Sequence, residues 1–453
     1  MKKKLLFGAL VVVALLLAAY RISCKAPAAE LTVNEQVLAI FEDGGCVSCH
    51  SAEPQLPFYS SIPIMGDVVK EDSQTGYKMF DIVPLIDGLK SGGKLSVVDV
   101  AKVEKAALDG DMPMAKYYLV HWGSQMTKAK ADIIASWAAV WRKEYYNDGL
   151  AGEVIRPVAQ SLEVDDAKVE LGRTLYHDTR LSVDNTVSCA SCHALNTGGV
   201  DNKQYSEGVY GQFGGVNAPT VYNAVYNFVQ FWDGRAATLE LQAAGPPLNP
   251  VEMGCKSFDE IIAKLSKDKS LTSKFKAVYP DGWSEANITD AIAEFERTLI
   301  TPNSRFDKYL MGEQTLTAEE IEGYELFQKY NCATCHAGVN LGGESYELMG
   351  QYADYFAARG TELTVEDNGR YKETALERDR HRFKVSGLRN VALTYPYFHD
   401  GTEPELKEAV CKMGTYQVGV ELTDAEEEKI VAFLNTLTGE LNGELLTNDN
   451  DNK

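Results

Sequence analysis

The sequence predicts a mainly α-helical protein of three similar units behind an N-terminal transmembrane helix. Three observations lead to this fold class. The motif C-x-x-C-H occurs three times, each copy follows a segment whose apolar residues recur at helical spacing, and an apolar run stands close to the N-terminus. A chain of 453 residues is also too long for one ordinary domain.

Residues 1–29 are predicted to be a signal-anchor or transmembrane segment. Three lysines precede the apolar run Leu5–Tyr20, which spans about 24 Å as a helix and is slightly short of a ~30 Å hydrocarbon core. A cleaved signal peptide and a lipoprotein signal ending at Cys24 are the alternatives. The only candidate cleavage site after the run is a weak one, and Arg21 stands where a lipoprotein signal has an apolar residue. We therefore favour an uncleaved anchor, with the rest exported to the periplasmic side of the bacterial inner membrane.

The charge balance is acidic, with 65 Asp and Glu against 44 Lys and Arg. This balance argues against nucleic acid as a partner and against a polybasic membrane patch. The last residues, 441–453, are predicted to form a polar tail.

The first unit covers residues 30–148. Its helix starts at Asn34 and leads to the motif "CVSCH" (46–50), and the unit closes with a helix over 127–145. Residues 149–166 lack helical periodicity and carry Gly and Pro, so they are predicted to be a linker.

The second and third units cover residues 167–304 and 305–440. Helices start at Ala167 and Ala318 and lead to "CASCH" (189–193) and "CATCH" (332–336). The closing helices are predicted over 287–300 and 423–437, with Thr289 and Thr423 as N-caps before acidic first turns. No clear linker separates these two units, so they are expected to pack as one body.

The three motifs predict three covalently bound haem c groups. The two thiols of each motif add to the haem vinyl groups, and the adjacent histidine then lies under the iron. Such attachment occurs outside the cytoplasm, in agreement with the N-terminal segment. The order of helix, motif, irregular stretch and closing helix resembles the cytochrome c fold. The predicted attachment residues are Cys46, Cys49, Cys189, Cys192, Cys332 and Cys335, and the predicted axial ligands are His50, His193 and His336.

The second axial ligand separates an electron carrier from a substrate site. In the first unit, Met112 in "GDMPMAKYY" is favoured over Met114 and His121, because a thioether in a loop before the closing helix suits an electron-carrying haem. In the third unit Met413, also expected in a loop, has the same relative position. In the middle unit no His or Met lies between "CASCH" and Trp232, so an open iron face is predicted.

Three cysteines, Cys24, Cys255 and Cys411, lie outside the motifs. In an oxidising compartment Cys255 and Cys411 could form a disulfide. Two separate buried thiols are the equal alternative, because the sequence does not give the distance between them.

Residues 165–440 resemble the bacterial dihaem cytochrome c peroxidases. The likeness is carried by "LYHDTRLS", "CASCHALNTGGVDN", "NAPTVYNAVYN", "FWDGRAATLELQAAGPPLNPVEM", "CATCH" and "GLRNVALTYPYFHDG". It implies that the last two units form one dihaem peroxidase body. The extra unit behind an anchor, with "CVSCHS" and "DMPMAKYYLVHW", resembles the trihaem quinol peroxidase branch of that family.

The resemblance implies roles for matching residues. Glu252 is the acid–base residue beside the middle haem, Gln242 orients peroxide, and Trp232 lies between the two peroxidase haems. Cleaving an O–O bond requires moving a proton from one oxygen to the other, which a carboxylate can do, and an amide offers both a donor and an acceptor. Asp233 and Arg235 are expected to form a buried ion pair that orders their turn.

The resemblance also implies a Ca²⁺ site between the two haem units. Its ligands would be Asn217 and the backbone oxygens of Thr394 and Pro396. Neutral oxygens of this kind suit Ca²⁺, and few carboxylates would mean modest affinity.

One departure from the family pattern affects the middle haem. Many relatives carry a histidine in a loop that caps this iron when it is oxidised, whereas here Val209 stands at that place. Valine cannot ligate iron, so we expect a substantially five-coordinate middle haem.

The predicted function is the reduction of hydrogen peroxide to two waters, with electrons delivered from membrane quinol through the N-terminal haem. The same peroxidase fed by a soluble cytochrome c or a copper protein is the first alternative. A non-enzymatic multihaem conduit is the second. A dihaem oxidase acting on a partner protein is the third, and Met413 counts against it because such relatives tend to use Tyr at that haem.

Overall fold

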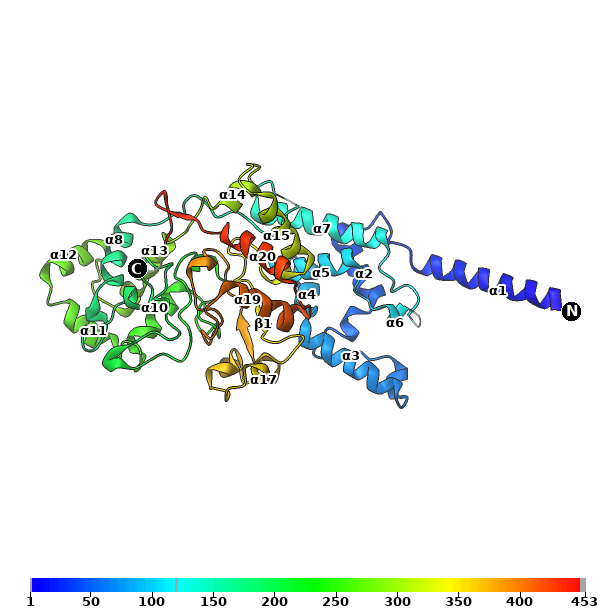
Figure 1. Ribbon diagram of the computed structural model, residues 1–453, viewed down its shortest axis with the longest axis horizontal. Helices are drawn as coiled ribbons and strands as arrows, with labels where there is room; N and C mark the ends of the chain where they lie inside the picture. The colour runs from blue at the N-terminus through cyan, green and yellow to red at the C-terminus, as the bar shows by residue number, and fades with distance from the viewer. Residues whose placement is uncertain (1, 119–120, 151, 449–453) are drawn as a thin grey trace. The chain divides into compact units, whose positions relative to one another are not determined.

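A computed structural model describes residues 2–118, 121–150 and 152–448 (Figure 1). The chain divides into two units, Met1–Val154 and Ile155–Lys453. Both are mainly helical. Within the described residues the regular strands form two short antiparallel pairs, both in the second unit.

The first helix, α1 (Lys2–Ser23), is apolar along most of its length. Its window Leu6–Ser23 has a mean hydropathy of 2.2 and is not buried within the protein, so by length and composition this helix can cross a membrane. A signal sequence has the same properties.

Among its described residues, the first unit contains six further α-helices. The helix before the motif, α2, begins with a capping box between Thr32 and Glu35 and ends at Gly45 in the left-handed conformation. It packs with α5 against α7 around a core that includes Val37 and Trp137. The predicted helices at both ends of this unit are thus confirmed. The six helices are α2 (Val33–Gly44), α3 (Met65–Met79), α4 (Val83–Ser91), α5 (Val97–Asp109), α6 (Ala115–Tyr118) and α7 (Lys128–Tyr146).

The N-terminal half of the second unit is built around the pair α8 and α13, which lie side by side (Figure 1). Helix α13 begins earlier than predicted. Its N-cap is Ser284, which accepts from the backbone N–H of Asn287, while Thr289 lies inside the helix and bonds back to the carbonyl of Glu285. The helices are α8 (Asp166–Tyr176), α9 (Cys189–Cys192), α10 (Leu239–Leu248), α11 (Phe258–Leu265), α12 (Lys269–Val278) and α13 (Glu285–Arg297).

The C-terminal half repeats this arrangement with α15 and α20. The predicted N-cap Thr423 is confirmed, and it forms a capping box with Glu426. Strand β1 (Tyr346–Leu348) pairs with β2 (Arg382–Lys384), with Glu347 opposite Phe383. The helices are α14 (Arg305–Leu310), α15 (Ala318–Lys329), α16 (Cys332–Cys335), α17 (Tyr355–Arg359), α18 (Tyr371–Thr374), α19 (Leu406–Lys412) and α20 (Asp424–Asn435).

Each of these two helix pairs crosses at a glycine. A Cβ added at Gly172 of α8 would lie 1.8 Å from the carbonyl oxygen of Ala291 in α13. A Cβ added at Gly323 of α15 would lie 1.9 Å from the carbonyl oxygen of Lys429 in α20. The two helix crossings are therefore as close as a backbone without a side chain allows.

Two segments differ from the sequence prediction. In the predicted linker 149–166, residues 155–158 belong to the second unit: Ile155 is fully buried and bridges to Gly338. In the predicted polar tail, β3 (Glu440–Leu441) and β4 (Glu444–Leu445) form a hairpin, and Leu446 is buried. Ile155 and Leu446 are buried against residues far away in the sequence, so local composition did not reveal either burial. The last five residues lie outside the described part.

Candidate active site

The three C-x-x-C-H motifs each form one tight helical turn. The backbone N–H of the histidine donates to the carbonyl of the first cysteine at 2.9, 3.0 and 2.9 Å in the three motifs. Because one turn separates the two thiols, this geometry brings them to one side with the histidine directly after them. The turns are Cys46–Ser48, Cys189–Cys192 and Cys332–Cys335.

The histidines of the motifs are prepared as neutral ligands. His50 Nδ1 lies 3.0 Å from the carbonyl oxygen of Gly76 and 3.1 Å from that of Phe80, and His336 Nδ1 lies 3.0 Å from the carbonyl oxygen of Leu341. A proton held at Nδ1 leaves the Nε2 lone pair for iron. Burial lowers the pKa of His50, His193 and His336, which favours the neutral ring.

The thiols fit covalent attachment. All six motif cysteines are free of disulfides, and burial raises the pKa of Cys46 and of Cys332 to about 12. Reduced, neutral thiols at this spacing are what the vinyl groups of a haem require. Cys255 and Cys411 are also free thiols, and Cys255 donates to the carbonyl of Leu181. Of the two alternatives for that pair, the structure has the separate thiols.

A buried lysine offers a further contact for a haem. Lys384 of β2 is 5% exposed, and burial lowers its pKa to about 8. Among the described residues no carboxylate forms an ion pair with it. A buried ammonium of this kind is costly unless an anion joins it, and a haem propionate would be such an anion.

Glu252 is a mostly buried carboxyl in the turn after α10. Asn249 donates to its Oε1 at 2.6 Å. Burial raises the pKa of Glu252, while the positive charge of Arg235 and the hydrogen bond from Asn249 act in the opposite direction. Burial thus favours the protonated carboxyl, whereas the charge of Arg235 and the hydrogen bond from Asn249 favour the carboxylate. Glu252 can therefore both accept and release a proton.

Val209 is packed against this turn. It is fully buried, and its backbone N–H donates to the carbonyl of Glu252 at 2.9 Å. A Cβ added at the neighbouring Gly208 would lie 2.0 Å from the carbonyl oxygen of Val251. The loop therefore rests on the Glu252 turn, with Val209 in the hydrophobic core and Tyr210 exposed. The five-coordinate middle haem stays a prediction.

The turn after Trp232 contains an ion pair, as predicted, but only one partner is buried. Arg235 Nη1 lies 2.9 Å from Asp233 Oδ2, with side chains 38% and 6% exposed. The Arg235 guanidinium also stacks over the ring of Phe231 at 3.5 Å. Its positive charge also opposes the rise in the pKa of Glu252, an interaction that sequence reasoning did not find because it assigned Arg235 only to the turn.

Trp232 and Gln242 lie on opposite sides of this turn in the sequence. The Trp232 indole donates to the carbonyl of Asn217 at 2.8 Å, and its ring makes edge contacts with Phe383 and His399. It thus joins the two halves of the second unit. Gln242 is half-buried on α10.

The two predicted methionine ligands occupy different structures. Met112 lies in the turn between α5 and α6 and is 38% exposed. Both ring nitrogens of the rejected alternative His121 form hydrogen bonds inside the first unit. Met413 is not in a loop as expected, because α19 continues into a π-helical turn that begins at this residue (Met413–Val418). Such turns occur often at functional sites. Both ligand assignments stay predictions.

The predicted Ca²⁺ ligands lie at the contact between the two halves. The Asn217 amide nitrogen donates to the carbonyl of Lys203 at 2.9 Å, and Asn217 N–H donates to the carbonyl of His399. Asn202 binds the carbonyls of Leu393 and Tyr395, which flank Thr394 in the chain, and Pro396 follows next. Neutral oxygen donors of this kind suit Ca²⁺.

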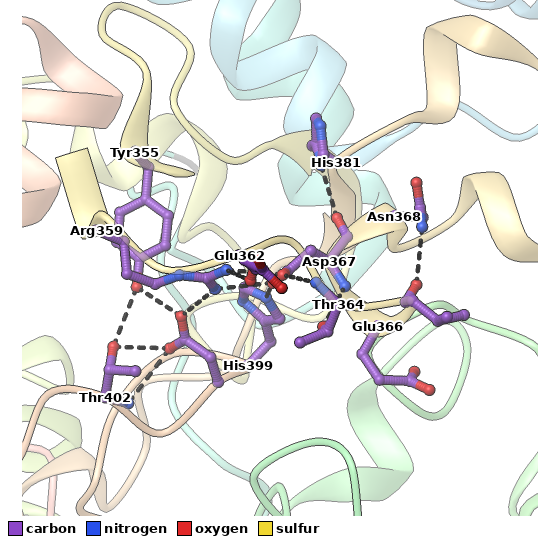
Figure 2. A network of polar contacts seen from close by, with 12 residues as sticks. Tyr355, Arg359, Glu362, Thr364, Glu366, Asp367, Asn368, His381, His399 and Thr402 are labelled. Atoms are coloured by element: carbon purple, nitrogen blue, oxygen red, sulfur yellow. Dashed lines mark hydrogen bonds and ion pairs between the residues drawn. The ribbon is translucent and has the colours of Figure 1, made fainter. Parts of the chain in front are cut away.

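A buried acidic cluster nearby was missed by sequence reasoning (Figure 2). Asp367, His399 and Asp400 approach closely enough to hold a metal ion. However, the Arg359 guanidinium lies between the two carboxylates, 2.7 Å from Asp367 and 2.8 Å from Asp400. A cation is therefore already in place, and Arg359 holds the pKa of Asp367 well below its ordinary value. His399 Nε2 donates to the same aspartate at 2.8 Å, which fixes the ring beside Trp232.

Two family models and several curated proteins are similar to this chain. The family described as "Di-haem cytochrome c peroxidase" matches residues 166–315, and "Haem-binding domain" matches residues 11–140. The chain is 49% identical to "Cytochrome c peroxidase Ccp" of Escherichia coli over 91% of this chain and 89% of that protein. The chain belongs to the di-haem cytochrome c peroxidase family.

Other relatives of this peroxidase cover less of it. "Cytochrome c551 peroxidase" of Nitrosomonas europaea is 45% identical over 64% of this chain and 85% of its own length. The crystal structure of a "MauG-like protein associated with microbial copper homeostasis" aligns with a TM-score of 0.55 and 29% identity, over 63% of this chain and 93% of that one. The peroxidase is thus a haem-containing oxidoreductase that acts on peroxide, with a haem-binding N-terminal unit. Its relatives imply hydrogen peroxide as the substrate and an electron donor as the partner.

Proposed function

We propose that this peroxidase reduces hydrogen peroxide to two waters with electrons from membrane quinol, carried through three covalently bound haems. The N-terminal helix would anchor it to the periplasmic side of the inner membrane. The observation that carries the peroxide chemistry is the half-buried Glu252 carboxyl, which accepts a hydrogen bond from Asn249 and whose pKa is raised by desolvation against the charge of Arg235.

The bound haem at Cys189 and Cys192 would supply the redox chemistry at peroxide. The side chains of the protein would then carry out the proton transfer. Glu252 takes a proton from one peroxide oxygen and returns it to the other, so that one oxygen leaves as water. Gln242 offers an amide that can both donate to and accept from the substrate. The Arg235 charge limits how far burial raises the pKa of Glu252, which keeps both directions of transfer accessible.

The electron route follows the three motifs. His50 and Met112 would ligate the first haem, His336 and Met413 the third, and His193 alone the middle one. Trp232 would lie between the two peroxidase haems, and a Ca²⁺ at Asn217, Thr394 and Pro396 would hold their halves together.

The acid–base role is tested with Glu252→Gln. We expect kcat to fall by about 10²–10⁴-fold, because an amide cannot exchange the proton. Haem content and the visible spectrum serve as the measure of intact folding. Glu170→Gln, on an exposed side chain, is the matched control and should leave kcat unchanged. A kcat within threefold of the wild type for Glu252→Gln would show that the proton moves by another route.

The donor is tested by comparing reduced quinone with a reduced soluble cytochrome c. The double variant Cys46→Ala and Cys49→Ala removes haem attachment in the first unit, so it should lose quinol-driven turnover and keep cytochrome-driven turnover. The relatives named "Cytochrome c551 peroxidase" favour the cytochrome as the alternative donor. The similarity to the E. coli relative covers 91% of this chain, so it extends into the extra N-terminal unit. This is the unit through which we propose that quinol delivers its electrons.

A further inference from the structure

A tyrosine and a histidine form a directed hydrogen-bonded pair in the first unit. Tyr59 O–H and His121 Nε2 lie 2.7 Å apart, and His121 Nδ1 lies 3.1 Å from the carbonyl oxygen of Tyr117. A carbonyl can only accept, so Nδ1 carries the proton and donates. Nε2 is then the acceptor for the Tyr59 hydroxyl. The pair thus has a fixed direction, with a proton available at Tyr59 and a place for it at His121.

The pair is connected to the first haem motif through Tyr117. The Tyr117 ring stacks on His121 with centroids 3.6 Å apart. Its hydroxyl lies so close to Gly45 that a Cβ there would be 2.3 Å away, and Gly45 directly precedes Cys46. Tyr59 lies nine positions after His50 in the chain, on the 3₁₀ turn Phe58–Ser61. Through Tyr117 the pair is thus connected to Gly45, the residue directly before the predicted haem attachment at Cys46.

The pair is also connected to the end of α1. Trp122, next to His121, makes an edge contact with Tyr20 of α1 at 5.8 Å. The neighbouring Gly123 approaches the backbone of Ser23, since a Cβ there would lie 3.1 Å from the Ser23 oxygen. Tyr and Trp at the end of an apolar span are typical of the membrane–water interface. If α1 crosses the membrane, His121 lies within a few residues of the bilayer surface.

An apolar surface surrounds Tyr59. Its two flanking segments expose Phe58 at 86% and Ile64 at 80%, and Ile62, Met65 and Val68 are also exposed. The turn is firmly built, because a Cβ at Gly66 would lie 2.1 Å from the Ser60 oxygen. Large apolar side chains exposed together on one turn and the start of the following helix suit contact with a lipid-soluble molecule.

We propose that Tyr59 and His121 are the proton-accepting end of a quinol-oxidising site on the membrane side of the first unit. The substrate class is a lipid-soluble benzoquinol or naphthoquinol, whose ring would enter from the apolar surface around Phe58 and Ile64. This inference rests on the proposed function, because it supplies the site at which quinol would deliver its electrons.

The step balances in protons and electrons. As a quinol O–H bond breaks, a new O–H bond forms at Tyr59, whose own proton moves to His121 Nε2. A haem held by Cys46, Cys49 and His50 would be the oxidant that accepts one electron. The half-buried imidazolium then returns its proton to water. A second round converts the semi-oxidised ring to quinone, and the two electrons together reduce one hydrogen peroxide to two waters.

The proposal is tested on the full chain in detergent with a short-chain quinol, and separately with ascorbate and a small redox dye as the donor. We expect Tyr59→Phe and His121→Gln to lower the ratio of quinol-driven to dye-driven peroxide reduction by about 100-fold. Tyr145→Phe, an exposed tyrosine on α7 of the same unit, should leave this ratio unchanged. A photoactivatable azidoquinone should label peptides that contain Phe58, Tyr59 or Trp122, which is a readout independent of turnover.

The possible outcomes distinguish a wrong location of the quinol site from a wrong identity of the electron donor. If both variants keep the wild-type ratio, or if the label lies elsewhere while the wild type oxidises quinol, the site is wrong and the proposed function stands. If the wild type reduces peroxide with the dye but never with quinol, the quinol donor itself is wrong, and the site with it.

Discussion

A single buried carboxyl should give this peroxidase an unusual dependence of stability on pH. Glu296 of α13 is 6% exposed, and burial, aided by the charge of Glu240, raises its pKa to about 8. The adjacent Arg297 is engaged elsewhere, because it forms ion pairs with Glu240 and Glu294. Glu296 is therefore protonated in the folded protein at neutral pH.

The raised pKa of Glu296 makes the folded protein less stable as pH rises. Between pH 4.5 and about 8 the folded protein holds a proton on Glu296 that the unfolded chain has released, so the free energy of unfolding falls as pH rises through this window. At 1.36 kcal/mol for each pH unit, the loss is about 3 kcal/mol at pH 7 and about 5 kcal/mol above pH 8. Below pH 4.5 both states are protonated and the effect vanishes.

Glu296→Gln removes this dependence, because an amide has nearly the shape of the protonated acid and never ionises. We expect the variant to match the wild type near pH 4.5 and to be more stable by about 3 kcal/mol at pH 7, as measured by urea unfolding at pH 4.5, 7 and 8.5. Asp290→Asn is the control of opposite sign, since hydrogen bonds from Lys168 and Tyr279 lower the pKa of Asp290 despite its partial burial, and its removal should destabilise above about pH 3.8. Equal stability of Glu296→Gln and the wild type at pH 8.5 would refute the protonated, buried state.

Three further predictions concern packing and the haem environment. Gly172→Ala and Gly323→Ala should each lower the free energy of unfolding, measured by urea titration, by at least about 2 kcal/mol, because the new Cβ would collide with a backbone oxygen. Gly152→Ala is the control, since Gly152 has open space around it and the substitution should have almost no effect. Lys384→Gln should lower the midpoint potential of one haem in a potentiometric titration, because a positive charge that favours the reduced state is lost; unchanged potentials would contradict a propionate contact. Met413→His should lower the midpoint potential of one haem by more than about 0.1 V, since a thioether ligand favours reduced iron. A visible spectrum and potentials identical to those of the wild type would exclude Met413 as a ligand.

The sequence predicted well where the signal is local. The helix that leads to each C-x-x-C-H motif and the cap at Thr423 follow from apolar spacing and capping chemistry within a few residues. For α13 the N-cap predicted from apolar spacing was wrong. Ser284 is the N-cap, and the Thr289 hydroxyl lies inside the helix and donates to the carbonyl of Glu285.

The rest depended on partners far apart in the chain. Ile155 is buried because it meets Gly338, and Arg235 acts on Glu252 across a folded loop. Tyr59 and His121 are 62 positions apart and carry no shared motif. Such contacts come from tertiary packing, which residue spacing cannot encode.

The glycine crossings of α8 with α13 and of α15 with α20 mark the same structural position in the two halves. A contact that only glycine can serve resists change, because every single substitution at Gly172 or Gly323 meets a backbone oxygen with nowhere to move. Two such contacts at matching places give both halves the same closest approach between their two main helices. They give a fixed pair of positions on which the two halves can be superimposed, so that the loops around the two haem motifs can be compared position by position.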